Sequence, residues 1–133
     1  MLENPISRAY VRTDNWAISA KIGDDRDAAQ WREIKVLDMA AGGMLILTDT
    51  PCVIGDEKWF DLLIDPMTPG VRGKIPMMIK GEIKGDRGSR DGLSSFSVAF
   101  TDISQSDRIR LDELIRITTQ KYRVDAESNM FDR

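Results

Sequence analysis

Apolar residues recur at every second position in several stretches of the chain. Between residues 16 and 22, one side carries a tryptophan, two isoleucines and an alanine, while the other side includes Ser19 and Lys21. This period of two is typical of a half-buried β-strand. The unbroken apolar run at 62–64 instead predicts a strand that is buried on both faces. The predicted strands are residues 16–22, 31–37, 44–47, 58–64, 75–83 and 93–100.

A different period begins after residue 104 and predicts one helix over residues 105–122. Ser104, followed three residues later by Asp107, is typical of a helix N-terminal cap. Apolar and small residues then recur at helical spacing and form one stripe. The stripe consists of Leu111, Leu114, Ile115, Thr118 and Tyr122. Residues 123–133 are polar and are expected to form a flexible tail.

These elements predict a mostly β fold, in which six antiparallel strands form a small barrel with a C-terminal α-helix. Residues 1–13 show no clear periodicity and are interpreted as an N-terminal arm. Residues 14–122 form the barrel and its helix, and 123–133 form the tail. The polar, glycine-rich stretch at 85–92 is expected to be a mobile connection between the last two strands.

Composition excludes several classes of function. The 133 residues include one cysteine and no histidine, which argues against an internal disulfide and against a zinc or haem site. The net charge of −3 argues against DNA or RNA binding through bulk charge. No apolar run is long enough to insert into a membrane, and no signal peptide is visible, so a cytoplasmic location is expected. No catalytic motif is present, and the chain is not expected to be an enzyme.

One corner of the predicted barrel carries a distinctive set of residues. Asp38 follows an apolar strand, and Gly42 and Gly43 precede the next strand. Two glycines allow positive φ and the close approach of another molecule. Upstream, Arg8 and Arg12 are spaced four residues apart. Planar guanidinium groups match the edge of guanine or a phosphate, and a carboxylate can accept hydrogen bonds from guanine. The combination favours recognition of a guanine nucleotide.

The order Arg8-x-x-x-Arg12 followed by Asp38-x-Ala40-x-x-Gly43 resembles the PilZ domain pattern RxxxR … (D/N)xSxxG. This resemblance implies a six-stranded PilZ-type barrel in a stand-alone PilZ domain protein of bacterial origin. It also implies binding of the second messenger cyclic di-GMP through these five residues, with no further cofactor. The bound state would then signal to a downstream protein partner as the ligand orders the arm.

Ala40 departs from the pattern, because PilZ domains carry a serine at this position. Loss of one hydroxyl hydrogen bond, about 0.5–1.5 kcal/mol, weakens binding by about two- to tenfold. The departure leaves open a second hypothesis, a degenerate PilZ domain that acts as a protein-interaction adaptor in motility or pilus function without binding nucleotide. A third hypothesis is an unrelated barrel that binds single-stranded nucleic acid, which the acidic composition disfavours.

Overall fold

The computed structural model describes residues 10–13, 16–67 and 73–131, with the backbone alone at 10–12 and 119–131. In the described residues, seven strands precede one helix. The elements are β1 (Tyr10–Arg12), β2 (Ala17–Gly23), β3 (Arg32–Ala40), β4 (Gly43–Thr48), β5 (Glu57–Asp65), β6 (Ile75–Arg90), β7 (Leu93–Asp102) and α1 (Gln105–Phe131). All six predicted strands and the predicted helix are therefore confirmed.

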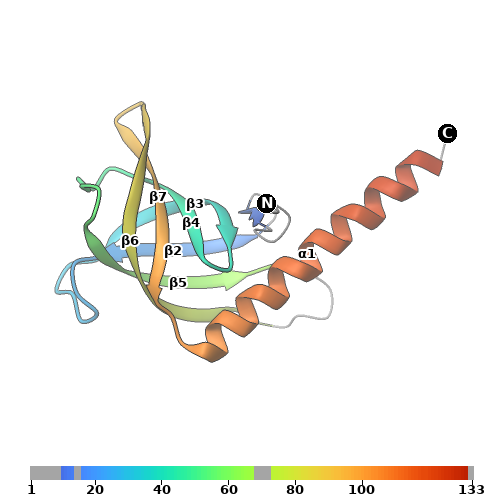
Figure 1. Ribbon diagram of the computed structural model, residues 1–133, viewed down its shortest axis with the longest axis horizontal. Coiled ribbons are helices and arrows are strands. Elements are labelled where there is room, and N and C mark those ends of the chain that lie inside the picture. Colours follow the sequence, from blue (N-terminus) through green and yellow to red (C-terminus); the bar gives the residue numbers. More distant parts are fainter. Residues whose placement is uncertain (1–9, 14–15, 68–72, 132–133) are drawn as a thin grey trace, which may run out of the picture.

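Strands β2 to β7 form a closed antiparallel barrel (Figure 1). The hydrogen-bonded order runs β3-β2-β5-β6-β7-β4, and β4 pairs back with β3 to close the ring. Strand β1 lies outside this ring and extends the sheet along the same edge of β3 that pairs with β2. It pairs with the end of β3, whereas β2 pairs with the start. The six-stranded barrel with a C-terminal helix confirms the predicted fold class.

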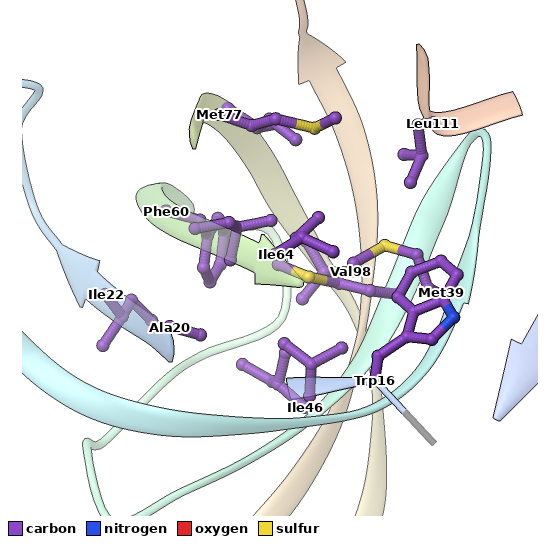
Figure 2. Close-up of a cluster of buried hydrophobic side chains, with 14 of the residues drawn as sticks. Trp16, Ala20, Ile22, Met39, Ile46, Phe60, Ile64, Met77, Val98 and Leu111 are labelled. Atoms are coloured by element: carbon purple, nitrogen blue, oxygen red, sulfur yellow. The ribbon is translucent and has the colours of Figure 1, made fainter. Parts of the chain in front are cut away.

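The interior of the barrel is filled by apolar side chains from every barrel strand (Figure 2). Phe60, Ile46 and Ile79 are completely buried, as is Leu111 from α1. The predicted alternation is confirmed in β6, where Met77, Ile79 and Ile83 point inward. Leu111, Leu114 and Ile115 join the same core. The helix therefore completes the barrel core with one stripe of its surface, as its sequence period predicts.

The N-terminal cap of α1 is also confirmed, because the Asp107 backbone N–H donates to the Ser104 hydroxyl at 3.1 Å. The helix continues to Phe131, beyond the predicted end at residue 122. Residues 123–131 include no glycine or proline that would stop a helix. The second half of α1 runs away from the barrel (Figure 1).

Three other features differ from the sequence predictions. Leu63 is exposed, because β5 has only its inner face against the core while Leu62 and Ile64 point inward. Residues 85–90 continue β6 rather than forming a loop, and the turn to β7 is limited to Asp91 and Gly92, both with positive φ. Strand β1 was not predicted, because three residues are too few to show a period.

No helix in the described part of the chain is long and apolar enough to cross a membrane.

Candidate functional site

The motif residues Asp38, Ala40 and Gly43 come together in the hairpin between β3 and β4. Ala40 pairs with Gly43, and residues 41 and 42 form the two-residue turn between them. The Gly42 carbonyl accepts a hydrogen bond from the Phe100 backbone N–H at 2.9 Å. This bond fixes the hairpin to the end of β7.

A β-bulge determines which way Asp38 points. The pairing of β3 with β4 shifts by one residue between Val36 and Asp38, so Leu37 is the extra residue. Val36 and Met39 are both buried although they are three positions apart. Without the bulge, Asp38 would share the inward face with Val36 and place a carboxylate in the apolar interior. The bulge therefore presents Asp38 on the outer surface of the barrel.

Gly43 is required for packing rather than for unusual backbone angles. A Cβ on Gly43 would lie 2.2 Å from the Val98 carbonyl oxygen of β7. A Cβ on Gly42 would meet nothing within 4 Å. Neither glycine has positive φ, so that part of the sequence interpretation is wrong. The close neighbour of Gly43 is the backbone of the adjacent strand.

Strand β1 brings the second arginine of the RxxxR motif to the same corner. In the β1–β3 ladder, Arg12 is the Cα partner of Asp38, and Tyr10 is the partner of Ala40. The side chain of Arg12 is not described, and Arg8 lies outside the described residues. The backbone register nevertheless places Arg12, the second arginine of the first motif, opposite Asp38, the acid of the second motif.

An open cavity of about 620 Å³ lies over this corner. Its lining includes Asp38, Ala40, Gly43 and Leu45 from the hairpin, with Arg87 from β6 and Ser97 from β7. Arg87 and Ser97 were not predicted to belong to the site. Their position depends on the β6–β7 pairing, which places Ser97 opposite Gly85. The sequence pattern of the polar stretch at 85–92 gives no signal for that pairing.

A second open cavity, of about 660 Å³, lies at the other end of β3 and β4. Its lining includes Arg32, Lys35, Leu47 and Asp49. It contains none of the motif residues, and Arg32 is already within 3.8 Å of Asp49. The cavity over the hairpin is therefore the better candidate for the site that the motifs predict.

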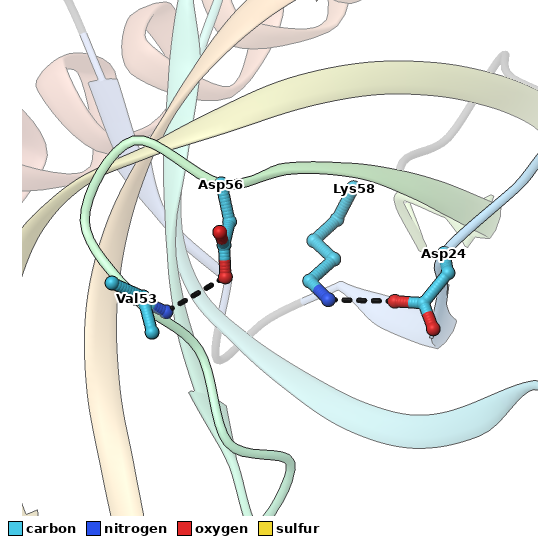
Figure 3. A network of polar contacts seen from close by, with 4 residues as sticks. All are labelled: Asp24, Val53, Asp56 and Lys58. Carbon is cyan, nitrogen blue, oxygen red and sulfur yellow. Dashed lines mark hydrogen bonds and ion pairs between the residues drawn. The ribbon is translucent and has the colours of Figure 1, made fainter.

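A polar network lies beside the start of β3, away from the motif (Figure 3). Lys58 Nζ lies 2.6 Å from Asp24 Oδ1. The hydrogen bond raises the pKa of Lys58 and lowers the pKa of Asp24. The Asp56 carboxylate accepts from the Val53 backbone N–H at 3.0 Å. These contacts fix two loops, and no metal-binding group of His, Cys, Asp or Glu occurs among the residues described.

Comparisons with known proteins identify the family. The PilZ domain family model matches residues 7–116, and no curated protein matches the chain. The structure of the inhibitor of motility (MotI/DgrA) from Bacillus subtilis is similar, with a TM-score of 0.64 and 17% identity. The similarity covers 90% of this chain but only 54% of that one, so this chain spans about half of that protein's length.

The PilZ domain of YcgR from Escherichia coli, solved with c-di-GMP, is also similar. Its TM-score is 0.52 at 17% identity, over 83% of this chain and 88% of that chain. At this identity the two structural similarities establish the fold alone. The family match covers most of the chain, including the hairpin, β1 and residues 105–116 of α1. The protein belongs to the PilZ domain family.

Proposed function

We propose that this PilZ domain is a bacterial cytoplasmic receptor that binds cyclic di-GMP in the cavity over the β3–β4 hairpin. The observation that supports this most directly is the pairing of Arg12 with Asp38. It unites the two halves of the family's binding pattern beside a cavity of about 620 Å³, which is within the usual range for ligand sites. The E. coli PilZ domain with c-di-GMP supports the choice of ligand by family analogy.

Each residue of the proposed site has a distinct chemical role. Arg8 and Arg12 donate paired hydrogen bonds to the guanine O6/N7 edge or to phosphate oxygens. The Asp38 carboxylate accepts from the guanine N1–H and the 2-amino group. Arg87, which lines the same cavity, supplies a further positive charge for the phosphates. Ala40 offers the ligand no hydroxyl group, so binding relies more heavily on the arginines.

Signalling follows from the position of the arginines before and within β1. Ligand that bridges Arg8 and Arg12 to Asp38 stabilises the pairing of β1 with β3, and a downstream protein reads the altered surface. The B. subtilis structural relative is named an inhibitor of motility. By analogy, we propose that this chain also regulates a cellular process, and that it does so through a protein partner.

Calorimetric titration with cyclic di-GMP tests the proposal. At about 100 µM protein, we expect a dissociation constant in the micromolar range or tighter, which corresponds to about −8 kcal/mol. GTP and cyclic AMP should bind much more weakly. Arg116→Ala removes an exposed guanidinium on α1. It controls for the general loss of one positive charge and should bind cyclic di-GMP as the wild type does. A flat titration of the folded wild-type protein would instead favour the adaptor hypothesis. That hypothesis arises because Ala40 replaces the serine of the motif.

A further inference from the structure

A buried hydrogen bond ties the start of β2 to α1. The Trp16 indole N–H donates to the Thr118 hydroxyl at 3.2 Å. The Thr118 hydroxyl in turn donates to the Leu114 carbonyl at 2.8 Å. Trp16 and Thr118 are only 6% and 5% exposed. Because the hydroxyl proton is directed to Leu114, a lone pair of the oxygen is left to accept the indole N–H. The orientation of both side chains is therefore fixed.

A second set of bonds ties the residue after Arg12 to the barrel. The buried Thr13 hydroxyl donates to the Val36 carbonyl of β3, the residue before the bulge. The Trp16 backbone N–H donates to the Thr13 carbonyl at 3.0 Å. The hydrogen bonds therefore form a chain that runs from the β3 bulge through Thr13 and Trp16 to Thr118. The most extensive strand contacts of α1 are also with β1 and β3.

We infer that α1 is a positioning element for β1, and that the Trp16–Thr118 hydrogen bond couples the ligand-binding strand to the helix. The part of this inference that concerns the ligand rests on the proposed function. Among the described residues, β1 pairs with β3 through Tyr10, Val11 and Arg12, and its seating there is supported by what fixes its C-terminal end. Thr13 and Trp16 supply that anchor, and Thr118 holds Trp16.

Seating β1 matters for affinity because only the seated strand places Arg12 opposite Asp38. The apparent dissociation constant rises in inverse proportion to the fraction of molecules in which β1 is seated. Thr118 therefore acts on the ligand through β1 rather than by contact. Coupling between two sites is reciprocal, so ligand that holds β1 in place also stabilises α1 around residues 114–118. In this way α1 becomes the element that reports occupancy of the site.

The first test needs no ligand. Thr118→Val removes the hydroxyl while preserving the shape of the side chain, and Thr118→Ser retains the hydroxyl. Thr48→Val is the matched control, because the buried Thr48 hydroxyl accepts from the Thr50 backbone N–H at 2.9 Å at the far end of β4. Amide hydrogen exchange at residues 10–16 should be about two- to tenfold faster in Thr118→Val alone. Equal exchange in all four proteins would overturn the positioning role, whether or not the protein binds nucleotide.

The second test adds cyclic di-GMP to the same four proteins. Thr118→Val should weaken binding by the factor by which it lowers the seated fraction of β1, at most about two- to tenfold, while Thr118→Ser and Thr48→Val bind as the wild type does. Ligand should slow amide exchange at residues 114–118 of the wild type and slow it less in Thr118→Val. If the wild type binds but ligand slows exchange at residues 114–118 equally in the wild type and in Thr118→Val, the coupling is refuted. If the wild type does not bind, the proposed function fails and the ligand-free exchange still decides the positioning role.

Discussion

Arg12 and Asp38 are directly paired across the β1–β3 ladder. The two halves of the binding pattern, which lie far apart in the sequence, are thus joined by backbone hydrogen bonding. The acid belongs to a hairpin fixed to β7 through the Gly42 carbonyl, so the corner is rigid on one side. Under the proposed function, the backbones of β1 and of the hairpin are therefore already placed for the ligand, which would lower the entropy cost of binding.

Arg12→Ala should abolish most cyclic di-GMP binding with little effect on the melting temperature. Loss of a charged, paired donor costs about 1.5–3 kcal/mol, which is about 10- to 150-fold in affinity. Strand β1 lies outside the barrel ring, so the core should be unaffected. Calorimetry and thermal unfolding measure the two effects separately. A large loss of stability with intact binding would show that the arginine is structural.

Gly43→Ala and Gly42→Ala should have opposite effects on stability. The new Cβ at Gly43 would overlap the Val98 carbonyl oxygen, and overpacking of this kind costs about 1–3 kcal/mol. The new Cβ at Gly42 meets open space, and its φ is not positive. That substitution should be neutral or stabilise by up to about 1 kcal/mol through the unfolded state. Urea denaturation measures both, and a more stable Gly43→Ala protein would contradict the described packing.

Ala40→Ser should tighten cyclic di-GMP binding. Ala40 lines the candidate cavity, and the added hydroxyl would supply a hydrogen bond worth about 0.5–1.5 kcal/mol. In an Arg8→Ala, Arg12→Ala background the same change should have much less effect, because the ligand is no longer held at that corner. Titration of all four proteins completes the cycle. Unchanged or weaker binding by folded Ala40→Ser would place the ligand elsewhere.

The stability lost in Asp24→Asn should depend on pH. The bond to Lys58 lowers the pKa of Asp24 below its ordinary value of 3.8, so this contribution is present above that pH and is lost as the pH falls below it. The pKa of Lys58 is raised above 10.5, so its contribution is lost only at higher pH. We expect a constant difference from wild type between these limits, measured by urea denaturation. Asp27→Asn in the same loop controls for the loss of one charge, and a difference that persists unchanged at pH 2 would exclude the ion pair as its source.

The barrel was predictable because its walls have one apolar face. In β2 and β6 the alternation of residues such as Ala20 and Ile83 with polar neighbours predicts both the strands and their orientation. The ribbon at 85–90 was missed because its residues lie beyond the core, so nothing selects for alternation there. Leu63 was misassigned because an apolar residue on an outer face looks the same in the sequence as a buried one.

The candidate site was predictable only in part. The motif residues Asp38, Ala40 and Gly43 are close together in the sequence. Their pattern can therefore be recognised without knowledge of the fold. Arg87 reaches the cavity through strand pairing over a long ribbon, which a local pattern does not report. The bulge at Leu37 depends on the register between β3 and β4. In the sequence its only trace is that the buried residues Val36 and Met39 are three positions apart instead of two.

The length of α1 has a mechanical consequence. From Thr118, where Trp16 holds the helix, α1 continues to Phe131, about 20 Å at a rise of about 1.5 Å per residue. A rigid rod of this length acts as a lever whose pivot is the indole contact. A tilt of about 5° at the pivot would displace the far end by about 2 Å. A change too small to alter the barrel wall would therefore be magnified where the helix extends beyond it.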